Sequence, residues 1–412
     1  MPGIIVKPRA RLFHGHEWIY AADVLKLFGE PQPGQVISLK DGKDRPLGSA
    51  IYNPKSQIVA RRFSRRKQDL DVDFFRRRLE RAWEYRKNLA TTQGLNLDLC
   101  RVVWSEADGL PGVVIDRYGD HFVLQTLTLG MDLAKSALVE ALVAVFQPKS
   151  IVERNDAPIR AAEGLTTVTG VLHGENPGAF RLDTGRGSFL VDLSSGQKTG
   201  LYLDQLDNYA AVAAFAQGRR VLDAFCNQGG FALACALAGA AAVTGIDSSE
   251  SAIASARENA TASGVSDRVR FEVANVFDFL KEAERRLHPG AGSDDAEPGE
   301  SPSAGGYDLI VLDPPSFARN KGSVHDALRG YKEIHLRALK LLRPGGLLST
   351  FSCSHHISRG EFMHTVIDAS VDAKKTLRLV KTHTQRPDHP VLPAIPETEY
   401  LKGYTFEVLG AF

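Results

Sequence analysis

From residue 220 onward, short apolar runs alternate with stretches of helical periodicity. The apolar runs cover residues 220–224, 242–246, 269–273, 308–312 and 346–351. The stretches that follow them cover about 229–237, 249–262, 276–287, 325–342 and 359–371. Repeated strand–helix units predict an α/β domain with a mostly parallel, doubly wound, Rossmann-like sheet. Residues 288–306, rich in Gly, Pro, Ser and acids, predict a flexible loop.

The first half of the chain has a different pattern. Residues 1–70 contain short apolar runs between turn signals and predict a small β barrel. Residues 71–195 mix strand and helix signals and predict a small α+β domain, which leaves 196–412 for the α/β domain. Between positions 61 and 87, eleven Lys or Arg residues stand against five Asp or Glu, with aromatic residues at helical spacing. This basic helix is either a solvated face or a contact for an RNA backbone.

Composition narrows the class of protein. The 412 residues are 43% hydrophobic with a net charge of +1, so no global field favours nucleic acid. The four cysteines show no paired spacing, and neither a membrane-spanning run nor a signal-peptide segment is apparent, so we expect a cytoplasmic protein. Adjacent histidines at 355 and 356 point in different directions, and we expect no metal.

The loop after the first strand of the α/β domain predicts a cofactor site. Residues 223–230 read Asp-Ala-Phe-Cys-Asn-Gln-Gly-Gly, and Gly229 allows close backbone approach at a helix N-terminus. Asp247 ends the next strand, where a carboxylate can accept from ribose hydroxyls, and Asn275 follows the third strand, where it can face adenine. Together these positions favour S-adenosylmethionine.

Two later strand ends carry reactive groups. Asp313 precedes two prolines that stiffen its loop, and Phe317 could wall a planar base. Cys353 lies between two serines after another apolar run. Carbon 5 of cytosine is too weak a nucleophile to take a methyl group directly, and a thiolate that adds to carbon 6 activates it. We therefore interpret Cys353 as the nucleophile and Asp313 as the group at ring nitrogen 3, and the other cysteines as structural.

Four motifs resemble the ribosomal RNA large subunit methyltransferase I family, which methylates cytosine carbon 5. They lie at residues 196–205, 223–231, 312–317 and 352–356. The resemblance implies an N-terminal PUA domain, a central α+β domain and a C-terminal class I methyltransferase domain. It implies Cys353 as nucleophile, with Asp313 assisting. It also implies cofactor contacts from Gln205, Asp223, Gly229 and Asp247. Further expected cofactor contacts are Phe225, Asn227, Ser248, Asn275, Val276 and Asp313. Expected substrate contacts are Lys7, Arg9, Arg61, Arg62, Pro314 and Phe317.

The chain also departs from the family pattern. Leu206 stands where the family often has Arg, and Asn275 stands where related enzymes have Asp. Pro315 replaces a second cysteine of related RNA cytosine methyltransferases, so the base that removes the carbon 5 proton is unidentified. We expect large-subunit rRNA, naked or in early assembly, as the partner, with a homodimer as a further hypothesis. Two alternatives stay open: a guanine-specific rRNA methyltransferase with an idle Cys353, and a non-catalytic RNA-binding or ribosome-assembly factor.

Overall fold

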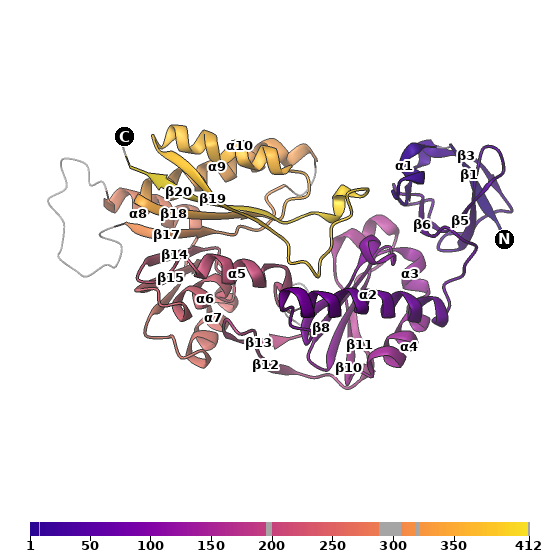
Figure 1. The fold of residues 1–412 in the computed structure, drawn as a ribbon, viewed down its shortest axis with the longest axis horizontal. Coiled ribbons are helices and arrows are strands. Elements are labelled where there is room, and N and C mark those ends of the chain that lie inside the picture. The colour runs from indigo at the N-terminus through magenta and orange to yellow at the C-terminus, as the bar shows by residue number, and fades with distance from the viewer. Residues whose placement is uncertain (8, 195–199, 288–305, 319–320, 411–412) are drawn as a thin grey trace. The chain divides into compact units, whose positions relative to one another are not determined.

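The chain divides into two compact units. The computed structural model describes residues 1–7, 9–194, 200–287, 306–318 and 321–410 (Figure 1). Unit 1 comprises Met1–Phe180, Val191–Leu203 and Pro387–Thr398, and unit 2 comprises Arg181–Leu190, Asp204–Arg386 and Glu399–Phe412. The loop predicted at 288–306 lies outside the described residues except for Gly306, and so does most of the first half of the 196–205 motif.

Unit 1 begins with a six-stranded sheet in the order β2-β6-β5-β4-β1-β3. In the strand Val36–Asp41, buried residues alternate with partly exposed ones, because one face packs on a core that includes Ile4, Ile37 and Leu39. In this sheet β1 and β4 pair in parallel, and the other pairings of its described strands are antiparallel. The elements are β1 (Gly3–Val6), α1 (Ala10–Phe13), β2 (Trp18–Ile19), β3 (Val24–Phe28), β4 (Val36–Asp41), β5 (Pro46–Tyr52) and β6 (Ala60–Ser64).

The rest of unit 1 is an α+β layer. Five strands in the order β11-β10-β9-β8-β7 share a core with helices α2 and α4. Helix α2 begins at an N-cap, Asp71, whose side chain accepts from the backbone N–H of Phe74, and it buries Phe74, Phe75 and Leu79. The elements are α2 (Val72–Gln93), β7 (Leu99–Trp104), η2 (Ser105–Asp108), β8 (Val113–Tyr118), β9 (His121–Thr126), α3 (Leu129–Leu133), α4 (Lys135–Phe146), β10 (Ser150–Asn155) and β11 (Val168–Gly174).

A seven-stranded sheet forms the centre of unit 2, in the order β16-β15-β14-β17-β18-β20-β19. The first five strands are parallel, and the last two pairings are antiparallel. The chain runs outward from β14 to β16 and then returns to place β17 beside β14, so the strand order reverses there. Ligands of such sheets bind beyond the strand ends at this reversal. The strands are β14 (Arg220–Ala224), β15 (Ala242–Asp247), β16 (Val269–Val273), β17 (Tyr307–Leu312), β18 (Leu342–Ser352), β19 (Thr376–Thr384) and β20 (Lys402–Leu409).

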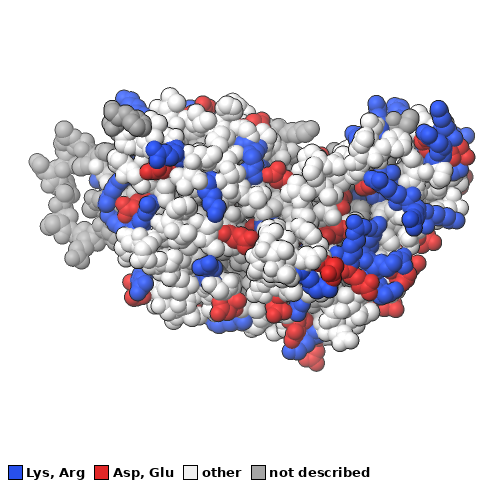
Figure 2. Space-filling view, viewed as in Figure 1, with Lys and Arg blue, Asp and Glu red and all other residues white. Residues whose placement is uncertain are grey.

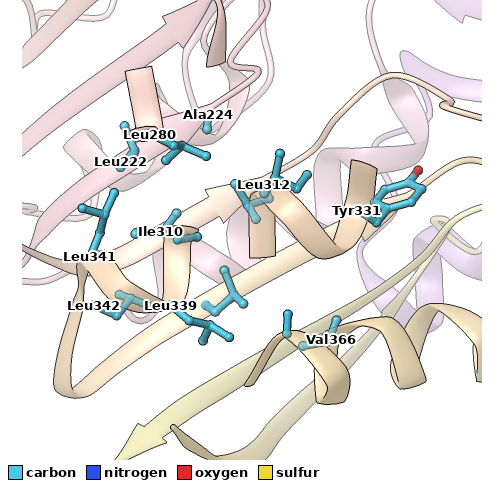
Figure 3. Packing of buried hydrophobic residues seen from close by; sticks show 14 of the residues in the cluster. Leu222, Ala224, Leu280, Ile310, Leu312, Tyr331, Leu339, Leu341, Leu342 and Val366 are labelled. Carbon is cyan, nitrogen blue, oxygen red and sulfur yellow. The ribbon is translucent and has the colours of Figure 1, made fainter. Parts of the chain in front are cut away.

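Helices cover both faces of this sheet (Figure 1). Helices α5, α6 and α7 form one layer, and α8, α9 and α10 form the other. Strand β17 is almost continuously apolar because both of its faces are buried. Figure 3 shows Ile310 and Leu312 of β17 in the core shared with the second layer. The helices are α5 (Leu206–Ala213), α6 (Gly230–Leu237), α7 (Glu250–Ala262), α8 (Val276–Leu287), α9 (Val324–Leu341) and α10 (Arg359–Asp372).

A short hairpin, β12 (Ala179–Asp183) and β13 (Ser188–Asp192), carries the chain between the units. The predicted mostly parallel, doubly wound α/β sheet and the β-rich N-terminal region are both confirmed. In the described part of the chain, no helix combines the length and the apolar character needed to cross a membrane.

Candidate active site

Asp223 lies at the carboxyl end of β14, at the strand-order reversal. Its side chain is fully buried, and Oδ2 accepts a hydrogen bond of 2.8 Å from the backbone N–H of Ala232. Its Oδ1 atom is also buried and has no hydrogen-bond partner among the described residues. Burial raises the pKa of Asp223 to about 8, and the nearby carboxylates of Asp313 and Asp247 act in the same direction. A buried acceptor of this kind suits a donor group on a ligand.

The loop after Asp223 has an unusual backbone. Phe225 (φ 67°) and Asn227 (φ 47°) both adopt the left-handed region, as does Gly229 (φ 86°). Such conformations cost of order 1–3 kcal/mol per non-glycine residue and persist where the surroundings enforce them. Asp247, at the end of β15, contributes to this, because its Oδ2 accepts from the backbone N–H of Asn227 at 2.9 Å. A side chain at Gly229 would meet the ring of Phe271 at 2.9 Å, so the loop requires glycine there.

Asp313 follows β17, the neighbour of β14 in the sheet. Its Oδ2 accepts a hydrogen bond of 2.9 Å from Nε2 of Gln205. Gln205 is itself oriented by Asn208, whose Nδ2 donates to Oε1 of Gln205 at 2.7 Å. Pro314 is buried, which anchors the loop that carries the carboxylate. Asp313 thus has a fixed carboxylate at the strand-end edge.

Cys353 follows β18, the neighbour of β17, and its side chain is partly exposed. The next residue, Ser354, links this loop to two others: its Oγ lies 3.1 Å from Oγ of Ser316 and 3.1 Å from the hydroxyl of Tyr331. Burial raises the pKa of Tyr331 to about 12, and the negative charges of Cys353 and Asp313 add to the effect. Both groups therefore lie within electrostatic range of one phenol.

Lys402 holds the loop after Cys353 from the other side. It begins β20 opposite Ser352, is 5% exposed, and donates from Nζ to the carbonyl oxygens of Ser354 at 2.7 Å and Ile357 at 2.8 Å. Burial lowers its pKa to about 8, while the negative charge of Cys353 acts in the opposite direction. A cation thus lies near the thiol on a rigid strand.

Four aromatic rings line the same edge of the sheet. Phe317 lies 4.8 Å from Tyr331, 6.0 Å from Phe277 and 6.3 Å from Phe225, measured between ring centroids. The rings come from the loops after β14 and β17, the start of α8, and α9. Phe317, in the loop that follows Asp313, therefore belongs to an aromatic cluster.

The other residues expected to contact a cofactor lie at the neighbouring strand ends. Ser248 is exposed after β15, and the backbone N–H of the following residue, Ser249, donates to Oδ1 of Asp247 at 2.9 Å. Asn275 is exposed, and its Oδ1 accepts from the backbone N–H of Phe277 at 2.9 Å. Val276 is buried in the core. The Asn275 oxygen caps α8 here, which leaves its amide nitrogen for any ligand.

The expected substrate contacts Lys7, Arg9, Arg61 and Arg62 belong to unit 1. Lys7 donates to the carbonyl of Ala22 at 2.7 Å, and Arg9 pairs with Asp23 at 3.0 Å. Arg61 is largely buried against Glu106 at 3.0 Å, and Arg62 is 3% exposed, with Glu17 as its ion-pair partner. Arg61 and Arg62 are therefore bound inside the protein, because these acids neutralise them.

The sequence analysis missed Tyr331, Ser316 and Lys402. Ser316 lies in the same sequence motif as Asp313 and could have been predicted from it. Lys402, at the start of β20, has no motif around it in the sequence. The cysteines outside the site are buried, and burial raises the pKa of the Cys226 and Cys235 thiols, in keeping with structural roles.

Comparisons with known proteins agree with this architecture. A PUA-like domain model matches residues 4–65, and a methyltransferase domain model matches residues 216–389. A solved SAM-dependent methyltransferase from Streptococcus mutans is 23% identical and superposes with a TM-score of 0.81, covering 99% of this chain and all of the other. A methyltransferase solved in complex with SAH is 25% identical, also with a TM-score of 0.81, covering 99% of this chain and 100% of the other.

Two curated relatives match nearly the whole chain. The ribosomal RNA large subunit methyltransferase I of Erwinia tasmaniensis is 38% identical over 410 residues, which is 98% of this chain and 99% of the relative. The enzyme of that name from Shewanella denitrificans is 39% identical over 397 residues, which is 95% of each chain. At this identity over this length, the chain belongs to the ribosomal RNA large subunit methyltransferase I family.

Proposed function

We propose that this protein methylates carbon 5 of a cytosine in large-subunit rRNA, using S-adenosylmethionine and a covalent adduct to Cys353. The observation that carries the proposal is the order of the strands β14, β17 and β18, which are adjacent and parallel. Their carboxyl ends bear the Asp223 loop, Asp313 and Cys353 in turn. A cofactor loop, a carboxylate and a thiol on one edge are the groups that this chemistry requires.

The residues proposed to hold S-adenosylmethionine fit a zwitterionic nucleoside. The orphaned Oδ1 of Asp223 suits the ammonium group of the methionine part. The backbone of the strained loop at Phe225, Asn227 and Gly229 can approach the ligand closely. Further contacts would come from Gln205, Asp247, Ser248, Asn275 and Val276. When bound, S-adenosylmethionine supplies an electrophilic methyl group.

The chain's own groups would then act on the flipped base. The Cys353 thiolate adds its electron pair to carbon 6, and the ring electrons move toward carbon 5 and nitrogen 3. When it carries a proton, the carboxyl group of Asp313 can donate a hydrogen bond at nitrogen 3 and so stabilise the adduct, while Oδ2 accepts from Gln205. Phe317 and Pro314 provide the wall for the ring. After methylation a base removes the carbon 5 proton, and the electron pair of that bond expels the thiolate from carbon 6.

Substitution of the nucleophile tests this proposal. Cys353→Ala should abolish formation of 5-methylcytidine in rRNA, because the ring is no longer activated, while S-adenosylmethionine still binds. Nucleoside mass spectrometry of rRNA incubated with each protein measures the product. A guanine methyltransferase needs no covalent activation, so methylated guanosine from the Cys353→Ala protein would contradict the cytosine proposal. The buried Cys235→Ala is the matched control, since it removes a thiol on α6 and not at the strand-end edge.

A further inference from the structure

A pocket of about 480 Å³ lies within unit 1. One wall is helix α2, with Arg78, Arg81 and Tyr85. The apolar segment 390–392 and part of the turn η2 also line the pocket. Two arginines therefore share a recess with an aromatic ring and an apolar rim.

The acidic residues of this pocket are already neutralised by other groups. Asp108 accepts from the fully buried Arg86, with 2.9 Å between Oδ2 and Nη2. Glu106 pairs with Arg61 at 3.0 Å and accepts from Nε1 of Trp18 at 2.8 Å. Neither carboxylate is paired with the two arginines of α2, so the pocket keeps an excess of positive charge.

Arg78 and Arg81 are three residues apart on one helix face, where like charges repel. Neither forms an ion pair with any residue that the structure describes. Arg78 is partly buried over the ring of Phe74 and donates from Nη2 to the carbonyl of Phe63 at 2.9 Å. Burial lowers the pKa of Arg78, and the charges of Arg81 and Arg77 act in the same direction. An anion placed between the two guanidinium groups would relieve this repulsion.

We propose that the pocket binds an unpaired nucleotide of the substrate RNA, with its phosphate between Arg78 and Arg81. Guanidinium groups match phosphate oxygens in a forked geometry, and bases stack on exposed aromatic rings. Tyr85 is 39% exposed and Val391 is 41% exposed, so both lining residues offer apolar surface to a base. Figure 2 shows Lys and Arg side chains, with Asp and Glu side chains among them, on the surface of unit 1. This inference rests on the proposed RNA substrate.

The test compares two double variants on the same helix. Arg78→Gln with Arg81→Gln removes the pocket pair, and Arg76→Gln with Arg77→Gln removes two exposed arginines that pair with Asp73. Binding of labelled single-stranded polyuridylate to the full chain is measured over a salt series. The pocket variant should lose about tenfold in affinity and about one unit of the salt slope, because the contacts with one phosphate disappear. The control should lose less than about twofold. The single variant Arg81→Gln, at an exposed position, should show about half of that slope change even if the double variant is unstable.

Equal losses in the two double variants would overturn the proposal, because net charge alone would then explain binding. Competition with AMP separates a free nucleotide from RNA as the source of the phosphate. The proposal would also be overturned if AMP bound in the pocket while the affinity for polyuridylate did not depend on Arg78 and Arg81. The readout is RNA affinity and not methyl transfer. If the proposed cytosine methylation were wrong, the RNA affinities of these variants would be unchanged. If the proposed nucleotide pocket were wrong, methylation at saturating RNA would be unchanged.

Discussion

The side-chain oxygens of Ser316 and Ser354 lie 3.1 Å apart and join the loop that carries Asp313 to the loop that carries Cys353. Each serine is within three residues of its reactive neighbour. The hydroxyl of Tyr331 contacts the same Ser354 oxygen at 3.1 Å and the Ser352 oxygen at 2.9 Å. The distance between carboxylate and thiol therefore depends on a small hydroxyl network and not only on the strands.

Ser316→Ala should lower kcat for RNA methylation about tenfold to a hundredfold, since small misplacement of reacting groups has effects of this size. The loss of one neutral hydrogen bond should cost only about 1 kcal/mol of stability. Steady-state kinetics with rRNA, together with thermal unfolding, would measure both quantities.

The matched control is Ser349→Ala. Ser349 lies on β18, and its Oγ is 2.9 Å from Oγ1 of Thr405 in the buried sheet. This variant should lose similar stability but keep its kcat. If both variants lose the same activity, the link between Ser316 and Ser354 has no special part in positioning.

Lys402→Met should slow alkylation of Cys353 by iodoacetamide about threefold to tenfold at neutral pH, because a nearby cation stabilises a thiolate. Lys402→Arg should restore part of the rate, since it keeps the charge. Mass spectrometry of the modified peptide gives the rate for Cys353 alone.

The effect of Lys402 on the alkylation rate of Cys353 should also depend on pH. Burial lowers the pKa of Lys402 to about 8, so its charge should disappear as the pH rises through that value. The gap between wild type and Lys402→Met should therefore narrow above about pH 8. A constant gap across the pH range would show that Lys402 acts only by packing.

Much of the α/β sheet could be predicted because buried strands such as β17 are apolar runs with helical patterns after them. Strand β19 could not be predicted in this way. Residues 381–384 have the polar character of a loop, yet they end an edge strand whose side chains are mostly exposed. An edge strand with one solvated face gives little hydrophobic signal.

Some residues of the candidate site could likewise be predicted from the sequence, and others could not. The positions of Asp313 and Cys353 at strand ends could be predicted, because unusual residues follow apolar runs there. Lys402 was not, because its partners are carbonyl groups 45 and 48 residues away, and only the antiparallel pairing of β18 with β20 brings them together. The RNA contacts expected from Arg61 and Arg62 stay a prediction, and the positive charge of these residues does not reveal the acids that pair with them.

Asp223→Asn should change how stability depends on pH in the cofactor-free protein. Burial raises the pKa of Asp223 to about 8, well above its unfolded value. The folded protein therefore holds a proton that the unfolded chain releases, and stability should fall as pH rises between about 4 and 8. The unfolding midpoint of Asp223→Asn relative to wild type should rise across this window and then level off.

The same substitution tests the cofactor contact. An ammonium group against Asp223 favours the charged carboxylate, so binding of S-adenosylmethionine near neutral pH should release a proton. Calorimetry in buffers with different ionisation enthalpies counts that proton. Equal proton release by wild type and Asp223→Asn would contradict the proposed contact.

The most direct test of the covalent mechanism uses rRNA in which cytidine is replaced by 5-fluorocytidine. Fluorine at carbon 5 cannot leave as a proton does, so the adduct persists after methyl transfer. With S-adenosylmethionine present, we predict a denaturation-resistant protein–RNA complex whose linked peptide contains Cys353. Methylation of rRNA by the protein without any such complex, or a complex linked through another residue, would contradict the account.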